Sequence, residues 1–200
     1  RLAAYDVARY DQQGCYSPQM LFIERGGSIA PRQFAQYLAH ELAALEHKFP
    51  RRPLSISESS SIAAWRSAEE FAVDANVIGD VNGAWSVSYV EESDEIKPSE
   101  LNRSIRVVAV DDLQEVPERI APYKRLLQTV GIAVSPKRLL ILSKSLGAAG
   151  ITRISALGDM TAPEAGWHHD GRFNLSDLIR IVEIDGRTFL AADKLAPYAD

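Results

Sequence analysis

The chain has 200 residues, of which 46% are apolar and 24% charged, a balance typical of a globular protein long enough to bury a core. The formal net charge is -5 and the basic residues are scattered, which argues against a nucleic-acid-binding surface or a polybasic membrane contact. No run approaches the roughly 18 to 20 apolar residues that span a bilayer. We therefore expect a cytoplasmic protein with no membrane span and no nucleic-acid partner, acting on a small organic molecule.

The N-terminal elements predicted from the sequence frame a lone cysteine. Residues 3–10 mix small, aromatic and branched apolar side chains and predict a short helix. The apolar run Met20 to Ile23 is short and aromatic enough to be a buried strand. Polar residues and a glycine interrupt the pattern between these elements, so Cys15 is predicted on a loop just before a core strand.

The rest of the chain alternates between predicted helices and strands. Apolar residues every three or four positions indicate helices, and short apolar runs or strict alternation indicate strands. In chain order we predict a helix over 31–49, a serine-rich loop over 55–61, a helix over 63–72, a half-buried strand over 85–89, a strand over 105–110, helices over 116–130 and 139–146, a strand over 151–157 and a helix over 174–182. This order predicts an α/β fold with a largely parallel sheet, in one catalytic domain over 1–200.

Cys15 is the strongest candidate for chemistry. A lone cysteine is most often an inert buried side chain, and it can form neither an intrachain disulfide nor a cysteine-rich zinc site. This one, however, lies between Gly14 and Tyr16 in a polar loop rich in glutamine, where a thiol can meet a substrate. The thiolate is the attacking form, and the Cys15 backbone amide can stabilise the resulting oxyanion. The sequence does not identify the base that removes the thiol proton.

Metal and nucleotide motifs are not found. The stretch His40 to His47 begins like a zinc-protease helix but has Ala44 where the second ligand should stand, so no metal site is predicted. The glycines at 147 and 150 have the wrong spacing for a dinucleotide fingerprint and lie at the end of a predicted helix.

The loop that contains Trp167, His168, His169, Asp170 and Gly171 concentrates titratable groups after a predicted strand. Loops of this kind often carry binding residues. A turn whose histidines bond only to neighbouring groups explains the same residues, and both interpretations stay open.

Residues 10–19, YDQQGCYSPQ, resemble the nucleophile motif of the bioluminescence-type long-chain acyl-CoA reductases, a branch of the aldehyde dehydrogenase superfamily. The residues that match this motif are Tyr10, Asp11, Gln12, Cys15, Tyr16, Ser17 and Gln19. Residues 150–160, and HDG at 169–171 followed by LSDLIRIV, resemble the C-terminal signature of the family. The similarity covers residues 5–185.

The resemblance implies an aldehyde dehydrogenase-like catalytic domain whose largely parallel sheet is flanked by helices. It also implies that a fatty acyl-CoA is reduced to an aldehyde through an acyl-cysteine on Cys15, with NADPH, or alternatively NADH, as the hydride donor. The cofactor domain of the family precedes the cysteine. The chain would then be a fragment that lacks this domain and is inactive alone. The family also implies a homo-oligomer and a complex with acyl-transfer enzymes.

By this resemblance Cys15 is the nucleophile, and Gln12, Ser17, His169 and Asp170 are substrate-binding or site-supporting residues. The superfamily's oxyanion asparagine and general-base glutamate lie before the cysteine, outside this chain. Its Glu-Glu-x-Phe-Gly-Pro stretch has no counterpart near residues 104–105, so the cofactor-binding residues stay unassigned.

Two other functions stay open. A cysteine-dependent acyltransferase or thioesterase would use the same acyl-cysteine and pass it to a thiol or to water. A non-catalytic scaffold domain would carry Cys15 as a packed side chain.

Overall fold

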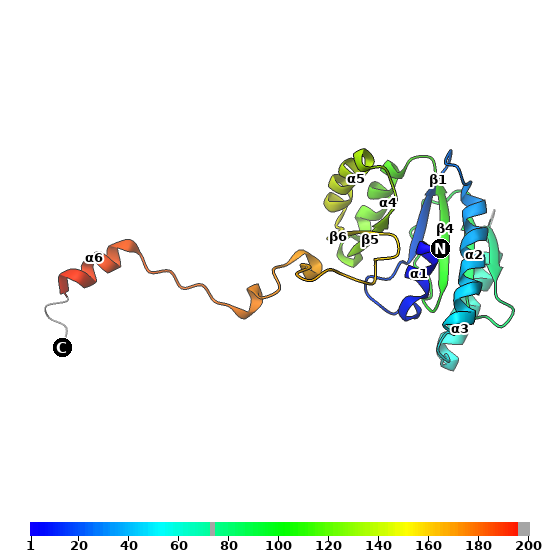
Figure 1. Cartoon of the computed structure of the whole chain (residues 1–200), viewed down its shortest axis with the longest axis horizontal. Helices are drawn as coiled ribbons and strands as arrows, with labels where there is room; N and C mark the ends of the chain where they lie inside the picture. Colours follow the sequence, from blue (N-terminus) through cyan, green and yellow to red (C-terminus); the bar gives the residue numbers. More distant parts are fainter. Residues whose placement is uncertain (73–74, 196–200) are drawn as a thin grey trace. The chain divides into compact units, whose positions relative to one another are not determined.

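The structure, a computed structural model, describes residues 1–72 and 75–195 (Figure 1). The chain divides into two compact units, Arg1–Trp167 and His168–Asp200. The first unit contains both β-sheets and both hydrophobic cores.

The larger sheet of the first unit has four strands in the order β1-β4-β3-β2. Its strands are β1 (Met20–Glu24), β2 (Ala75–Gly79), β3 (Ser86–Val90) and β4 (Ser104–Val110). β1, β4 and β3 are parallel, and β2 is antiparallel to β3. The α/β fold with a largely parallel sheet is thus confirmed, whereas β2 was missed by the sequence pattern.

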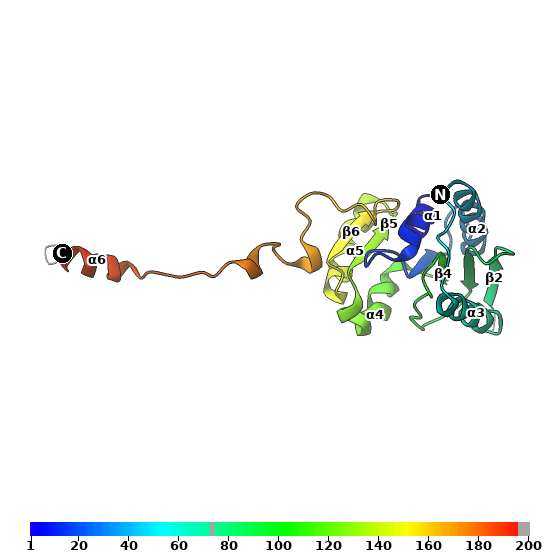
Figure 2. The same ribbon diagram turned by 90° about the horizontal axis from the view of Figure 1, so that it is seen from below.

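Helices cover both faces of this sheet. α1 (Leu2–Ala8) and α2 (Pro31–Lys48) pack on one face, where β3 and β4 contribute Val87, Tyr89 and Val107 to a common core. α3 (Ile56–Glu70) lies on the other side of the sheet from α2 (Figure 2). All residues of β3 and β4 are therefore buried, and the predicted half-burial of the strand over 85–89 is wrong.

Both serines of β3 are buried, and a charged side chain from α3 reaches one of them, Ser88. Ser88 Oγ donates to Glu69 Oε2 over 2.6 Å, and Glu69 is itself fully buried. Arg106 of β4 places Nε 3.1 Å from the same Glu69 oxygen. A hydroxyl and a guanidinium thus stabilise this buried carboxylate, and the alternation of serine with apolar residues marks two covered faces rather than one exposed face.

The predicted loop over 55–61 is also wrong, because these serines begin α3. Ser55 Oγ accepts a hydrogen bond from the Glu58 backbone N–H over 3.2 Å, and the Glu58 carboxylate accepts one from the Ser55 N–H over 2.8 Å. This reciprocal capping box satisfies two backbone donors of the first helical turn.

A second, two-stranded sheet pairs β5 (Thr129–Ile132) with β6 (Arg153–Ala156) in parallel, and α5 (Pro136–Ala149) connects them. α4 (Val116–Ile120) packs with α5 in the second core. The predicted helix over 116–130 is wrong in its second half. α4 ends at Ile120, a 3-10 turn follows over Ala121–Leu126, and β5 comes next. Pro122 has no backbone N–H to continue an α-helix.

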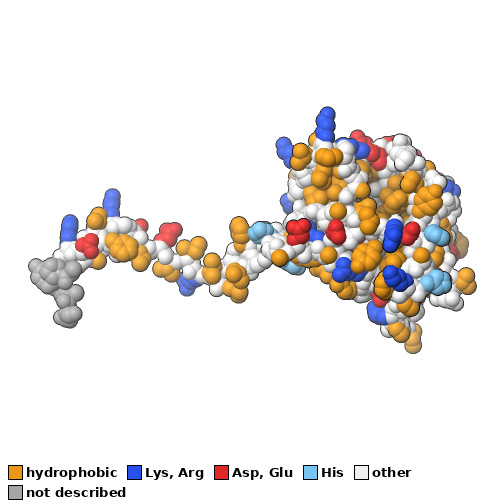
Figure 3. All heavy atoms as spheres, in the orientation of Figure 1, with side chains coloured by type: hydrophobic (Ala, Val, Ile, Leu, Met, Phe, Trp, Pro, Cys, Tyr) orange, Lys and Arg blue, Asp and Glu red, His pale blue; other side chains and the backbone are white. Residues whose placement is uncertain are grey.

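The second unit contains 3-10 turns at His169–Gly171 and Ser176–Leu178 and the helix α6 (Gly186–Leu195). The predicted helix over 174–182 is wrong, because only the 3-10 turn Ser176–Leu178 is helical in this range. All of the unit's described side chains are exposed, and Figure 3 shows hydrophobic ones along it. The large exposed apolar residues are Phe173, Leu175, Leu178, Ile179, Ile181, Val182, Ile184, Phe189, Leu190 and Leu195. Within the described parts of the chain, no helix is long and apolar enough to cross a membrane.

Candidate active site

Cys15 lies in a tight turn at the amino end of the parallel sheet. The turn is closed by a 2.9 Å hydrogen bond from the Ser17 N–H to the Gly14 carbonyl oxygen. Met20, the first residue of β1, is in register with Arg106 of β4. Because parallel strands begin at the same edge of a sheet, the loop before β1 and the turn before β4 meet there. The Cys15 thiol is free and exposed at this edge.

Two residues near Cys15 in the loop, Gln12 and Ser17, are buried, although the thiol is not. Gln12 is fully buried, and its Nε2 donates to the Pro18 carbonyl over 2.8 Å and to Ser99 Oγ over 3.3 Å. Ser17 is only 6% exposed. Among the described residues, Gln12 Oε1 and Ser17 Oγ have no hydrogen-bond partner. The loop is thus anchored on both sides of the thiol, and two buried polar atoms beside it remain available.

Gly14 leaves room for an aromatic ring beside the thiol. A Cβ atom at Gly14 would lie 2.5 Å from Cε2 of Tyr16 and 3.2 Å from Ser17 Oγ. A contact as short as that with Tyr16 does not occur in folded proteins, so a side chain at Gly14 would displace the Tyr16 ring. Gly14 therefore fixes the shape of the turn that carries Cys15.

Two left-handed turns meet at the base of this loop. Tyr10, Asp11 and Gln12 have φ angles of 53°, 50° and 61°, and a second group of three before β4 has φ angles of 59°, 51° and 65°. The second group consists of Leu101, Asn102 and Arg103. The Asn102 N–H donates to the Asp11 carbonyl over 3.0 Å and joins the two turns. Left-handed conformations are unfavourable for residues with a Cβ, so other contacts must hold them.

Arg103 provides one of these contacts, and no sequence motif pointed to this residue. Its side chain is 4% exposed, and its Nε lies 2.8 Å from Asp11 Oδ1. Its Nη1 lies 2.6 Å from Glu46 Oε2 and 2.9 Å from the Phe49 carbonyl oxygen. Asp11 is part of the nucleophile motif, but its partner lies 92 positions away in the chain.

The structure brings three of the five predicted site residues together. Gln12, Cys15 and Ser17 share one loop, whereas His169 and Asp170 belong to the second unit. His169 Nδ1 lies 3.1 Å from Asp170 Oδ2, and both side chains are more than half exposed. Asp170 has a φ angle of 54°. The assignment of this pair to the site of Cys15 stays a prediction.

The carboxyl end of the parallel sheet is where α/β enzymes often bind nucleotides. A pocket of about 410 Å³ lies at this edge, and its lining includes four carboxylates, those of Glu92, Asp94, Asp111 and Glu115. Arg25 and Arg119, which also line it, pair with carboxylates at 2.8 and 2.6 Å. This acidic lining does not fit the pyrophosphate of a nicotinamide cofactor.

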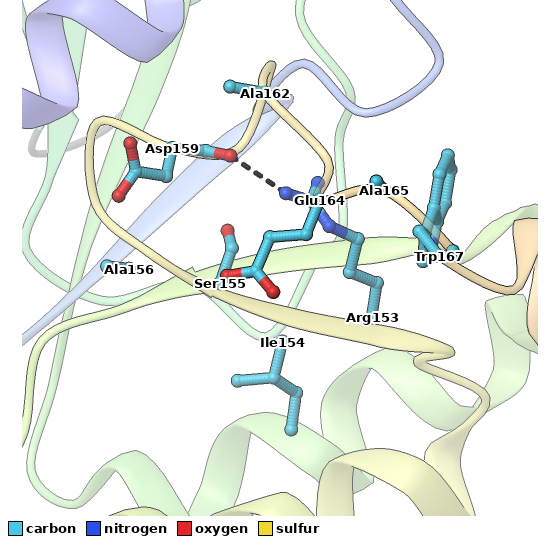
Figure 4. A pocket seen from close by; sticks show the side chains of 10 residues that line it. Arg153, Ile154, Ser155, Ala156, Asp159, Ala162, Glu164, Ala165 and Trp167 are labelled. Atoms are coloured by element: carbon cyan, nitrogen blue, oxygen red, sulfur yellow. Dashed lines mark hydrogen bonds between the residues drawn. The ribbon is translucent and has the colours of Figure 1, made fainter.

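A larger pocket of about 640 Å³ lies beside β6 (Figure 4). Arg153 points across it, donates to the carbonyls of Asp159 and Met160 and lies 5.4 Å from the centre of the Trp167 ring. The guanidinium thus ties down the loop after β6. None of the predicted site residues lines this pocket.

Among the described residues, no group of three or more His, Cys, Asp or Glu side chains is arranged to hold a metal ion.

Comparisons with known proteins identify relatives of the chain. It is 28% identical over 195 residues to a long-chain acyl-protein thioester reductase of Photorhabdus luminescens. The matched region covers 97% of this chain and 39% of that protein. The chain therefore spans about two fifths of the length of this relative.

A solved structure supports the predicted fold. The structure of an NAD-dependent aldehyde dehydrogenase from Burkholderia multivorans superposes on this chain with a TM-score of 0.57 at 14% sequence identity. The match covers 77% of this chain and 32% of the dehydrogenase chain. At this identity the likeness concerns the fold alone, and it confirms the predicted aldehyde dehydrogenase-like architecture. The model of the acyl-CoA reductase (LuxC) family matches residues 1–181, most of the chain. The chain belongs to the acyl-CoA reductase (LuxC) family.

Proposed function

We propose that Cys15 is the nucleophile of an enzyme that reduces a long-chain acyl thioester to an aldehyde through an acyl-cysteine intermediate. The observation that carries this proposal is an exposed thiol on a loop in which two other residues, Gln12 and Ser17, are buried and hydrogen-bonded. The family of the chain and the name of its relative support an acyl-CoA or an acyl-protein as substrate.

The chemistry begins with loss of the thiol proton. The Cys15 thiolate attacks the carbonyl carbon of the acyl thioester, the new C–S bond forms, and the original C–S bond breaks as the CoA or protein thiolate leaves. Among the described residues, no acceptor takes the Cys15 backbone N–H, so this amide can donate to the developing oxyanion. Covalent capture divides one difficult reduction into two easier steps.

A nicotinamide cofactor, when bound, would supply a hydride to the captured acyl carbon, and the bond from this carbon to Cys15 Sγ would then break, which releases the aldehyde and regenerates the thiolate. The acidic lining at the carboxyl end of the sheet disfavours pyrophosphate binding there. We propose that the cofactor, NADPH or NADH, is bound mainly by residues outside this chain. Homo-oligomerisation and a complex with acyl-transfer enzymes are part of the same proposal.

The test uses the full-length protein and tetradecanoyl-CoA. Mass spectrometry should find the acyl group on the Cys15 peptide, and neutral hydroxylamine should remove it because the linkage is a thioester. Addition of NADPH should then remove the adduct and release tetradecanal. Cys15→Ser should abolish adduct and aldehyde, whereas Ser60→Ala, an exposed substitution on α3, should leave both unchanged.

Other results would favour the alternative functions. Release of CoA without oxidation of NADPH or NADH would indicate a thioesterase or acyltransferase. Absence of any adduct on Cys15 would indicate a non-catalytic domain.

A further inference from the structure

The turn that carries Cys15 depends on an unfavourable backbone. Three successive residues before it, Tyr10 to Gln12, have positive φ angles although none is glycine. The left-handed conformation is unfavourable for such residues because their Cβ approaches the following carbonyl oxygen. A free loop would relax to other conformations. The thiol of Cys15, which lies three positions after Gln12, would then be displaced. Something outside the loop must therefore stabilise it.

The stabilising contacts converge on Asp11, the middle residue of this turn. Its carbonyl accepts the Asn102 N–H over 3.0 Å, its Oδ2 accepts the Arg52 backbone N–H over 3.3 Å, and its Oδ1 lies 2.7 Å from Arg103 Nη2. Gln13 Nε2 adds a 3.1 Å hydrogen bond to Asn102 Oδ1. The loop is thus attached to the turn before β4 by backbone and side chain.

Arg103 is the most deeply buried of the charged side chains in its ion pairs with Asp11 and Glu46. Its side chain is 4% exposed, compared with 14% for Asp11 and 24% for Glu46. Its guanidinium joins Asp11 to Glu46 and to the Phe49 carbonyl at the end of α2. A planar guanidinium can reach three acceptors in fixed directions, which a lysine ammonium on a flexible stem does not reproduce. Its own backbone carbonyl accepts the Ser86 N–H over 3.0 Å, so β3 holds it in place.

We propose that Arg103 is a positioning residue for Cys15: its guanidinium holds Asp11, and through it the left-handed turn at 10–12, so that the thiol is presented in the geometry that accepts an acyl group. The proposal rests on the proposed role of Cys15 as nucleophile. Arg103 contacts the loop and not the substrate. It acts on the rate of acylation through the backbone of the loop.

The experiment measures acylation of Cys15 in the full-length protein, with tetradecanoyl-CoA and rapid quenching. Rate constant and amplitude are recorded for wild type, Arg103→Gln, Arg103→Lys and Asp11→Asn. A misplaced nucleophile lowers the rate constant on the order of 10- to 100-fold while the amplitude stays near one acyl group per chain. A purely structural loss lowers the amplitude instead, because fewer molecules are folded.

Two comparisons sharpen the result. Arg103→Lys should recover part of the rate, and Arg103→Gln combined with Asp11→Asn should be no slower than the worse single variant, because both remove the same contact. Arg138→Gln is the matched control. Arg138 pairs with Glu24 at 2.5 Å at the opposite end of β1, so its loss should leave the rate constant within twofold of wild type.

The outcomes separate this inference from the proposed function. If wild type forms no adduct, the proposed function fails. If wild type is acylated and the folded Arg103 and Asp11 variants react at the wild-type rate, the positioning role is overturned. If the Arg103 and Asp11 variants all fail to fold by circular dichroism, or lose amplitude without change in rate constant, the role of Arg103 is structural and the inference is likewise overturned.

Discussion

At the scale of single residues, the position of the Cys15 thiol depends on Gly14, which has no side chain. Gly14 precedes Cys15, and the Tyr16 ring occupies the space that a Cβ would need. The ring is half-buried, so it cannot turn into solvent without losing contacts. The turn geometry, and with it the position of the thiol, thus requires glycine at this point.

Gly14→Ala should therefore disturb the site. We expect it to displace the Tyr16 ring, to lower the free energy of unfolding by about 1 to 3 kcal/mol and to slow alkylation of Cys15 by iodoacetamide. Urea unfolding and peptide mass spectrometry measure the two effects. Gly27→Ala is the control, because a Cβ there meets no atom closer than 3.8 Å. Equal alkylation rates in wild type and Gly14→Ala would contradict this role of the glycine.

Some of the site could be predicted from the sequence because it is local. Gln12, Cys15 and Ser17 lie within six positions, so one short motif contains all three. Arg103 and Ser99 could not be found this way, since they reach the loop only through the parallel register of β1 and β4. A short motif gives no information about hydrogen-bond partners that lie about 90 positions away in the sequence and come close to the loop only when the sheet forms.

At the scale of elements, two glycines near the end of α5 have opposite roles. Gly150 ends the helix with a φ angle of 118°, and a Cβ there would lie 3.1 Å from both Cα and O of Lys124. Gly147 lies within α5, and a Cβ there would meet nothing within 4 Å. One glycine is required by the backbone, and the other only weakens the helix.

Alanine substitutions should separate these roles. We expect Gly150→Ala to destabilise the protein by about 1 to 3 kcal/mol through strain and collision, and Gly147→Ala to stabilise it by about 0.5 to 1 kcal/mol. Thermal and urea unfolding followed by circular dichroism give both values. A Gly150→Ala protein as stable as wild type would show that the end of α5 tolerates another conformation.

The sequence pattern predicted elements well where periodicity was clear, as for α2 and β4. It failed where one residue type supports two structures. The serines at 55–61 are common in loops, yet Ser55 serves as a helix cap. Apolar spacing suggested one helix over 116–130, but Pro122 ends it early and Val130 lies in β5. These outcomes depend on tertiary contacts that local spacing does not contain.

At the scale of the whole first unit, a buried carboxylate connects the two ends of its chain. Asp6 of α1 is 1% exposed, and its carboxylate accepts the Gly158 N–H over 2.6 Å and the Met160 N–H over 3.1 Å. These bonds span more than 150 positions and fix the loop after β6 against α1. No local pattern predicts such a contact, although Gly158 and Met160 fall in the stretch that resembles the family's C-terminal signature.

This carboxylate should make stability depend on pH. Burial raises the pKa of Asp6 above its ordinary value of 3.8, against the lowering effect of the two backbone donors. The folded state then holds the Asp6 proton more tightly than the unfolded chain. The contribution to stability is fully present below pH 3.8 and is lost as the pH rises through the raised pKa.

Urea unfolding of wild type and Asp6→Asn from pH 3 upward tests this prediction. Asparagine cannot titrate, so the stability of wild type relative to Asp6→Asn should decline with rising pH across the window that begins near 3.8 and should be constant above it. Asp94→Asn, at a side chain that is 97% exposed, is the control for substitution of an aspartate. A difference that rises with pH would mean that the N–H donors of Gly158 and Met160 outweigh burial, so that this link between the chain ends is strongest with Asp6 ionised.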